Sequence, residues 1–189
     1  MNDDLLVYQA KSFYNAYIAL DQLSRDDSDT LLLLFAPLVV NGAFSVELAL
    51  KAILAKNQIE YGKEHNLLIL FQMLPKSFQQ ELWAYLIEKA PEYAGSEKGL
   101  DELILLSNAF VDWRYAFEGK PVPAIESRFL AAFANAAVHT MFSYYNADLL
   151  PATKTESNNE IEQRFHENRE KCKEINLKMI QKKTKEHQL

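Results

Sequence analysis

The chain has a single cysteine, Cys172, among its 189 residues. One thiol cannot form a disulfide within the chain, and it favours a reducing compartment, which we take to be the cytoplasm. The first residues, Met1-Asn2-Asp3-Asp4, are acidic where a secretory signal would be basic. The densest apolar run, residues 31–40, is shorter than the roughly 20 residues that a membrane span needs. We therefore expect a cytoplasmic protein that does not bind a membrane.

Glycine and the familiar catalytic motifs are scarce as well. Only five glycines are present, and none belongs to a phosphate-binding loop. The sequence also lacks paired-cysteine, His-Glu-x-x-His and nucleophile-elbow motifs. We therefore expect no cofactor and no metal site. A formal net charge of −6 argues against a strongly basic nucleic-acid binder.

The charge divides the chain into two parts. Residues 1–151 carry a net charge of −8, whereas residues 152–189 carry +2 and are mostly polar. The stretch from Pro151 to Asn159 has the composition of a linker. We predict a helical bundle over residues 1–150 and, over 151–189, a linker with a charged amphipathic C-terminal helix that docks on a subunit.

The apolar residues recur at steps of three and four, which indicates helices throughout. No segment alternates as a strand does. The sequence predicts an all-α fold, an antiparallel bundle of four to five main helices plus a short one. The expected helices are an N-terminal one ending near Ser24, a buried one over about 31–56, a short one starting near His65, and others over about 78–90, 103–117 and 124–148.

Three local features refine this prediction. Ser77-x-x-Gln80 is a capping-box pattern for the helix that follows. Pro37 predicts a kink or a delayed start in the buried helix. Small residues line one side of the buried helix and one side of the last helix, so we expect these two helices to pack closely. They are Gly42, Ser45, Ala49 and Ala52, and Ser127, Ala131, Ala134 and Val138.

Polar groups on apolar helices are the candidates for a functional site. Glu47 and Lys51 are four residues apart on the buried helix. They form either an ordinary surface pair or a buried site, and a buried carboxylate needs partners. His65 begins the next helix and Arg114 ends a later one, so we expect Glu47, His65 and Arg114 to converge. Their role is either structural or substrate-contacting.

Three groups of residues resemble bacterial members of the HEPN superfamily over about residues 5–148. They are Ser45-x-Glu47-x-x-x-Lys51-Ala-x-Leu54, Glu64-His65-Asn66-Leu67 with Leu74-Pro75, and Trp113-Arg114-Tyr115-x-x-Glu118. The resemblance implies a helical bundle that is usually a homodimer. Many members act in toxin–antitoxin, phage-defence or RNA-processing systems. The binding residues that we predict are Glu47, Lys51, His65, Arg114, Tyr115 and Glu118.

The chain departs from the ribonucleases of this superfamily, which carry Arg, often followed by Asn, with His four to six residues further on. Arg128 and His139 are eleven residues apart, or roughly 16 Å along a helix. Ala134 stands where the arginine before Asn135 would be. We therefore favour a non-catalytic binding or regulatory module with a nucleotide, RNA or protein partner.

Two alternatives stay open. One is a metal-independent endoribonuclease with a rearranged site, whose candidate residues are Arg114, His139 and His65. The other is a structural subunit that only joins other proteins. Aromatic residues in excess of one bundle core also favour a homodimer through the first or last core helix. They are Tyr14, Phe133, Tyr144 and Tyr145.

Overall fold

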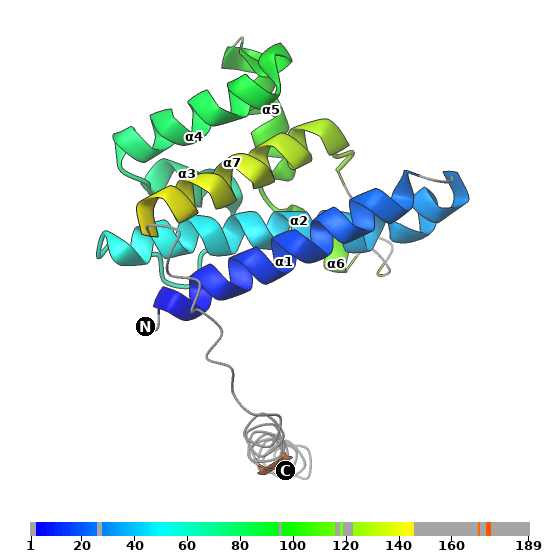
Figure 1. Cartoon of the computed structure of the whole chain (residues 1–189), viewed down its shortest axis with the longest axis horizontal. Helices are drawn as coiled ribbons and strands as arrows, with labels where there is room; N and C mark the ends of the chain where they lie inside the picture. The colour runs from blue at the N-terminus through cyan, green and yellow to red at the C-terminus, as the bar shows by residue number, and fades with distance from the viewer. Residues whose placement is uncertain are drawn as a thin grey trace. The chain divides into compact units, whose positions relative to one another are not determined.

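The computed structural model describes residues 3–25, 28–94, 96–115, 118, 123–145, 170 and 173–174. The chain divides into two compact units, Met1–Leu149 and Leu150–Leu189. The first unit is helical, and the described residues contain no strand, which confirms the predicted all-α class (Figure 1). Its helices are α1 (Asp3–Ser24), α2 (Ser28–Lys56), α3 (Leu67–Met73), α4 (Lys76–Lys89), the 3-10 turn η1 (Pro91–Tyr93), α5 (Ser96–Leu106), α6 (Ala109–Arg114) and α7 (Ser127–Tyr145).

Helices α2 and α7 form the centre of the bundle and approach each other closely. A Cβ atom on Gly42 of α2 would lie 3.1 Å from the side chain of Leu130 on α7, so glycine is what allows this contact. Near the other end of the pair, the Tyr145 hydroxyl donates to the Ala52 carbonyl at 2.9 Å. The start of α7 therefore meets the middle of α2, and the two helices run in the same direction (Figure 1).

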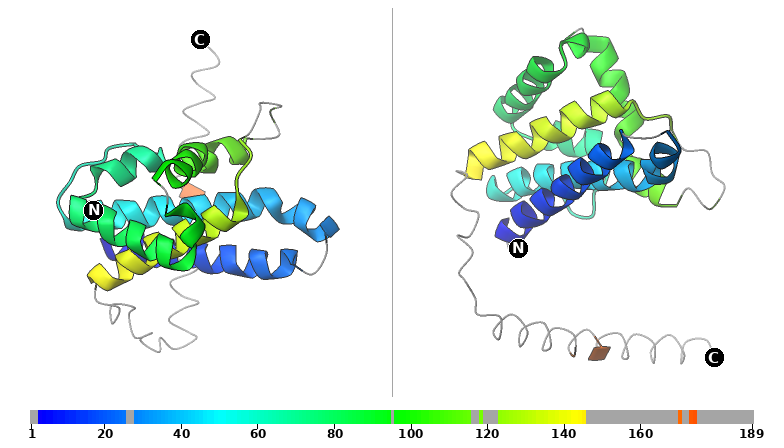
Figure 2. Two further views of the ribbon diagram at one scale, coloured as in Figure 1. Left: turned by 90° about the horizontal axis from the view of Figure 1, so that it is seen from above. Right: turned by 45° about the vertical axis from the view of Figure 1, so that its right-hand side comes forward.

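The remaining long helices run opposite to this central pair. Helix α1 lies along α2 in the opposite direction and also reaches α7 (Figure 2). On the other side of α7, the Tyr85 ring of α4 stacks on His139 with centroids 4.0 Å apart. Phe78, near the start of α4, meets Tyr144 near the end of α7. These two contacts show that α4 is antiparallel to α7.

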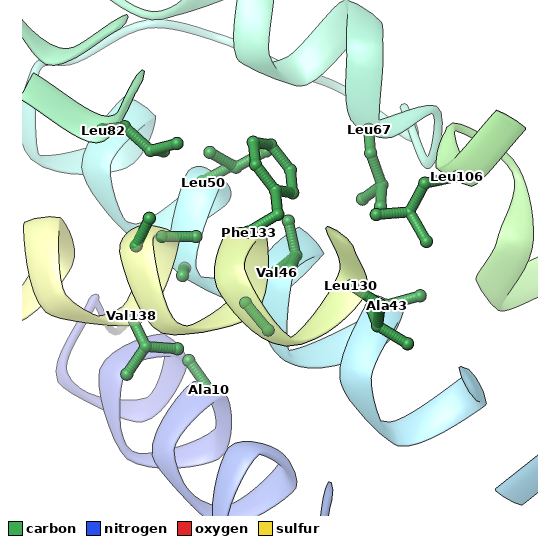
Figure 3. Packing of buried hydrophobic residues seen from close by; sticks show 14 of the residues in the cluster. Ala10, Ala43, Val46, Leu50, Leu67, Leu82, Leu106, Leu130, Phe133 and Val138 are labelled. Atoms are coloured by element: carbon green, nitrogen blue, oxygen red, sulfur yellow. The ribbon is translucent and has the colours of Figure 1, made fainter. Parts of the chain in front are cut away.

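The apolar side chains of α2 and α7 supply the middle of the core. Val46, Leu50 and Phe133 are fully buried and lie together between the two helices (Figure 3). By length and composition, the stretch Leu33–Lys56 in α2 is apolar enough to cross a membrane. Burial within the bundle accounts for that composition, because a core helix is apolar on nearly all sides.

Two predicted helix boundaries are wrong. The single helix expected over 103–117 is interrupted after Leu106, where the Leu67 amide of α3 donates to the Ser107 carbonyl at 2.8 Å. That carbonyl serves the start of α3 instead of continuing a helix. The Ser77 capping box does not form, because α4 already starts at Lys76 and has no side-chain cap.

Gln79, the residue before the glutamine of that pattern, connects α3 to α4. Its side chain donates to the carbonyls of Gln72 and Leu74, at 3.1 and 2.7 Å, at the end of α3 and just after it. Pro37 lies inside α2, which begins at Ser28 without the delayed start that the proline suggested.

The predictions for residues 151–189 fall almost entirely outside the described residues. These include the linker and the charged amphipathic C-terminal helix. Glu170, Lys173 and Glu174 are helical, and the Lys173 ammonium lies 2.6 Å from the Glu170 carboxylate. Cys172 and the end of the predicted 103–117 stripe, Phe117, are also outside the described residues.

Candidate functional site

Glu47 lies in the core and accepts two charge-assisted hydrogen bonds. Only 1% of the Glu47 surface is exposed. The Lys51 ammonium, one turn along α2, lies 2.8 Å from Oε1. The His65 ring places Nδ1 2.9 Å from the same oxygen. The surface-pair interpretation therefore does not apply, because the carboxylate is buried and the Lys51 side chain is only 9% exposed.

The loop before α3 fixes the position of His65. Glu64 Oε1 accepts from the backbone amides of His65 and Asn66, at 2.9 and 2.7 Å. Asn66 is the N-cap of α3, and its Oδ1 accepts from the Ile69 amide at 3.1 Å. Side-chain oxygens thus satisfy the amides that begin the helix. These hydrogen bonds hold the backbone around His65 in the position from which its imidazole reaches Glu47.

This geometry determines which imidazole nitrogen faces outward. A carboxylate only accepts hydrogen bonds, so Nδ1 of His65 carries the proton toward Glu47. The His65 side chain is 50% exposed, and Nε2 is the nitrogen left to contact solvent or a ligand. Among the described residues, no group bonds the second oxygen of Glu47, Oε2, which is also buried. The trio of Glu47, Lys51 and His65 therefore joins α2 to the loop before α3 and exposes one imidazole edge.

Arg114 and its neighbours lie in a different place from this trio. The Arg114 guanidinium donates to the Tyr115 hydroxyl at 3.1 Å and lies 4.7 Å from the Phe110 ring centroid. The Phe110 ring in turn stacks on Phe44 of α2. Glu118 is exposed, and its amide donates to the Tyr115 carbonyl. Of the six predicted binding residues, the structure brings together Glu47, Lys51 and His65. It places Arg114 at the end of α6, with Tyr115 and Glu118 after it.

The residues of α7 that correspond to a ribonuclease motif are held in other contacts. Arg128 forms an ion pair with Glu92. Asn135 donates to the Tyr14 hydroxyl at 2.6 Å. His139 is exposed, and its ring stacks on Tyr85 of α4. Each polar side chain therefore has a packing partner on a different element.

Burial also limits which side chains the positions before His139 can hold. The positions four to six residues before it are Asn135, Ala134 and Phe133. Ala134 and Phe133 are 0% exposed. An arginine at either position would have to be buried in the core, at a large energetic cost. The catalytic spacing is thus missing from the sequence, and at Ala134 and Phe133 the fold leaves no room for the cation.

A groove between α1, α4 and α7 was not foreseen from the sequence. It encloses about 380 Å³. Its walls combine aromatic rings, cations and small side chains. The principal lining residues are Tyr14, Tyr17, Asp21, Arg25, Tyr85, Lys89, Arg128 and Asn135. The sequence analysis named three of these residues for other reasons: Tyr14 for association, and Arg128 and Asn135 for the ribonuclease spacing.

A larger hollow of about 570 Å³ lies over α3, α4 and α5, away from the charged groups described above. Apolar side chains dominate its lining, with Trp83 and Leu100 among them, and Lys76 is its one charged lining residue. Among the described residues, no group of three or more His, Cys, Asp or Glu side chains is placed to hold a metal ion.

Comparison with known proteins gives one match. Residues 38–128 match the family model described as the HEPN domain. The matched region starts within α2 and ends at the start of α7, so it contains Glu47, Lys51, His65 and Arg114. No curated protein and no solved structure matches the chain.

Proposed function

We propose that this chain, which belongs to the HEPN domain family through residues 38–128, is a non-catalytic binding and regulatory module. The settings implied by the resemblance, toxin–antitoxin, phage-defence and RNA-related systems, are part of the same proposal. The acidic charge of residues 1–151, −8, favours a compact ligand or a protein over a long RNA.

The observation that carries the proposal is the burial of Phe133 and Ala134 beside His139. Proton transfer to RNA needs an acid or base within about 3 Å of the reacting oxygen, and a cation to hold the phosphate. Helix α7 carries one such cation, Arg128, and it lies eleven residues before His139, roughly 16 Å along the helix. Arg114, the other candidate, contacts Phe110 and Tyr115 on α6, whereas His139 lies against α4.

An RNA cleavage assay tests this proposal. Purified protein in molar excess is incubated with end-labelled single-stranded RNA, with and without divalent metal. A double variant, Arg114→Ala with His139→Ala, serves as the control for a contaminating nuclease. We expect no product above the buffer blank from either protein. Cleavage by the wild type that the double variant abolishes would replace the binding module with the rearranged ribonuclease.

We also propose that two copies of the chain associate through α1. The aromatic residues that favoured a homodimer in the sequence do not support this association, because two of them pack within the bundle. Phe133 is buried, and Tyr145 donates to a backbone carbonyl within the core. A different feature of α1 supports it. Leu5, Tyr8 and Leu23 are 50%, 57% and 57% exposed.

Small exposed residues continue the line between these three side chains. The full stripe steps by three and four along one face of α1. It consists of Leu5, Tyr8, Ser12, Ala16, Ala19 and Leu23. Small side chains in the middle let a second helix approach closely, and the apolar ends supply buried area. This stripe fits the α1 helix of a second copy.

Light scattering coupled to size exclusion tests the association at tens of micromolar protein. We expect the mass of a dimer for the wild type and of a monomer for a Leu5→Glu, Tyr8→Glu variant, because the interface would have to bury two carboxylates. Gln72→Glu, an equally exposed position on α3, is the matched control and should stay dimeric. A wild-type monomer would contradict the proposed interface.

A further inference from the structure

The groove between α1, α4 and α7 gathers positive charge on an acidic bundle. Three of its lining residues are cations, Arg25, Lys89 and Arg128, and one is a carboxylate, Asp21. The cations come from three elements: the turn after α1, the end of α4 and the start of α7. The bundle and linker residues 1–151 together carry −8. These four lining residues therefore sum to +2 on an acidic bundle.

Each of these cations has a carboxylate partner that leaves it accessible. Arg25 lies 2.6 Å from Asp21 and its side chain is 72% exposed. Arg128 pairs with Glu92 and its side chain is 67% exposed. Exposed ion pairs contribute little to stability, so a guanidinium can turn toward a ligand at small cost. Its planar fork suits a carboxylate or a phosphate.

The aromatic walls of the groove fit a ring. The Tyr85 ring stacks on His139 with centroids 4.0 Å apart, and the Lys89 ammonium lies 5.1 Å from the Tyr85 centroid. The centroids of Tyr14 and Tyr17 lie 6.2 Å apart on the opposite helix, α1. A volume of about 380 Å³ is at the small end of the range for organic ligands.

Two phenol hydroxyls have hydrogen-bonding capacity left for a ligand. The Tyr17 residue is 1% exposed, and among the described residues no group bonds its hydroxyl. Burial raises the pKa of Tyr17, with the Asp21 carboxylate adding to the effect, so the hydroxyl keeps its proton and acts as a donor. Tyr14 accepts from Asn135, and its own O–H proton is therefore still available.

An unpaired buried hydroxyl carries the cost of lost hydration, which a ligand oxygen would remove. We infer that this groove, hereafter the anion groove, binds a small organic anion with one ring. An arene carboxylate and an arene phosphate ester share the required chemistry. The ring lies among the tyrosines, one oxygen of the anionic group accepts from Tyr17, and Arg25 and Arg128 bind its other oxygens. The inference rests on the proposed binding function and names its ligand class.

Calorimetric titration of the full chain with four probes tests the inference. The probes are phenyl phosphate, benzoate, inorganic phosphate and benzyl alcohol. We expect at least one of the two ring anions to bind at least about tenfold more tightly than inorganic phosphate and benzyl alcohol, because only it uses both the rings and the cations. The stronger of the two ring anions identifies the oxyanion. Equal affinity for inorganic phosphate would mean an adventitious ion only and would overturn the inference.

Variants separate the anion groove from the rest of the surface. Tyr17→Phe and an Arg25→Gln, Arg128→Gln double variant should each weaken ring-anion binding, the double variant by at least about tenfold. Lys76→Gln, in the larger hollow, is the matched cation control and should bind as the wild type does. Thermal unfolding of every variant checks that it is folded. Unchanged affinity in folded groove variants, or no binding of either ring anion, would overturn the inference.

The outcomes also separate this inference from the proposed function. Absence of ring-anion binding together with absence of RNA cleavage would remove the anion groove alone. RNA cleavage that depends on His139 would remove the binding module, whatever the calorimetry shows.

Discussion

Replacing Glu47 by alanine should destabilise the bundle clearly. The substitution removes the acceptor of both the Lys51 ammonium and the His65 imidazole. The Lys51 side chain is 9% exposed, so its charge would remain in the core without a counter-charge. The His65 side chain is half exposed and can turn toward water. Most of the cost therefore comes from Lys51.

The magnitude follows from the burial of this pair. Removing one partner of a buried ion pair costs about 3–5 kcal/mol of unfolding free energy. In a protein of this size each kcal/mol lowers the Tm by roughly 2–4 °C. The expected fall for Glu47→Ala is therefore about 6–20 °C. A Glu47→Leu, Lys51→Leu double variant should recover most of this loss, because it leaves no unpaired charge.

Thermal unfolding followed by circular dichroism measures these changes. Glu88→Ala is the control, because Glu88 pairs with Lys89 on the exposed surface of α4, and its Tm should equal that of the wild type. A Glu47→Ala protein that melts within about 2 °C of the wild type would refute the reasoning. So would a double variant that is no more stable than Glu47→Ala.

Two further predictions concern packing and pH. Gly42→Ala should lower the free energy of unfolding by about 1–3 kcal/mol in a denaturant titration, because the added Cβ would lie 3.0 Å from the Tyr17 side chain and 3.1 Å from that of Leu130. A denaturant midpoint equal to that of the wild type would contradict the close approach of these helices. Burial, and secondarily the Glu126 carboxylate, raises the pKa of Glu102, so the folded state keeps this proton to higher pH than the unfolded state. Stability therefore falls as pH rises through the raised pKa, and Glu102→Gln should gain Tm relative to the wild type at about pH 7 but not at about pH 4. An equal difference at both pH values would contradict this assignment.

Helical periodicity made most of the fold predictable from sequence. The contact between α2 and α7 was predicted from small residues, and Gly42 on α2 does make it, but its partner on α7 is Leu130 and not one of the predicted small residues, of which Ser127 is exposed. The burial of Glu47 followed from its apolar neighbours on α2, and the structure gives it the histidine at the start of the next helix as a partner. Both inferences rest on spacing within one helix, which the sequence displays directly.

Long-range hydrogen bonds account for what the sequence did not predict. The interruption after Leu106 depends on the Leu67 amide, which reaches the Ser107 carbonyl from a distant segment. The apolar stripe continues across this interruption, so periodicity alone predicts one helix. The anion groove likewise combines side chains from α1, α4 and α7, and no local pattern reports such a combination.

We propose that His139 is a packing residue outside any RNA site. Nuclear magnetic resonance of its imidazole protons tests this most directly. Stacking on Tyr85 should place these resonances at unusual, upfield positions that return to ordinary values in Tyr85→Ala. We expect titration with a non-cleavable single-stranded oligonucleotide to leave these resonances unchanged. Resonances that move in saturable fashion with the oligonucleotide would show that His139 faces RNA, and the packing role would be wrong.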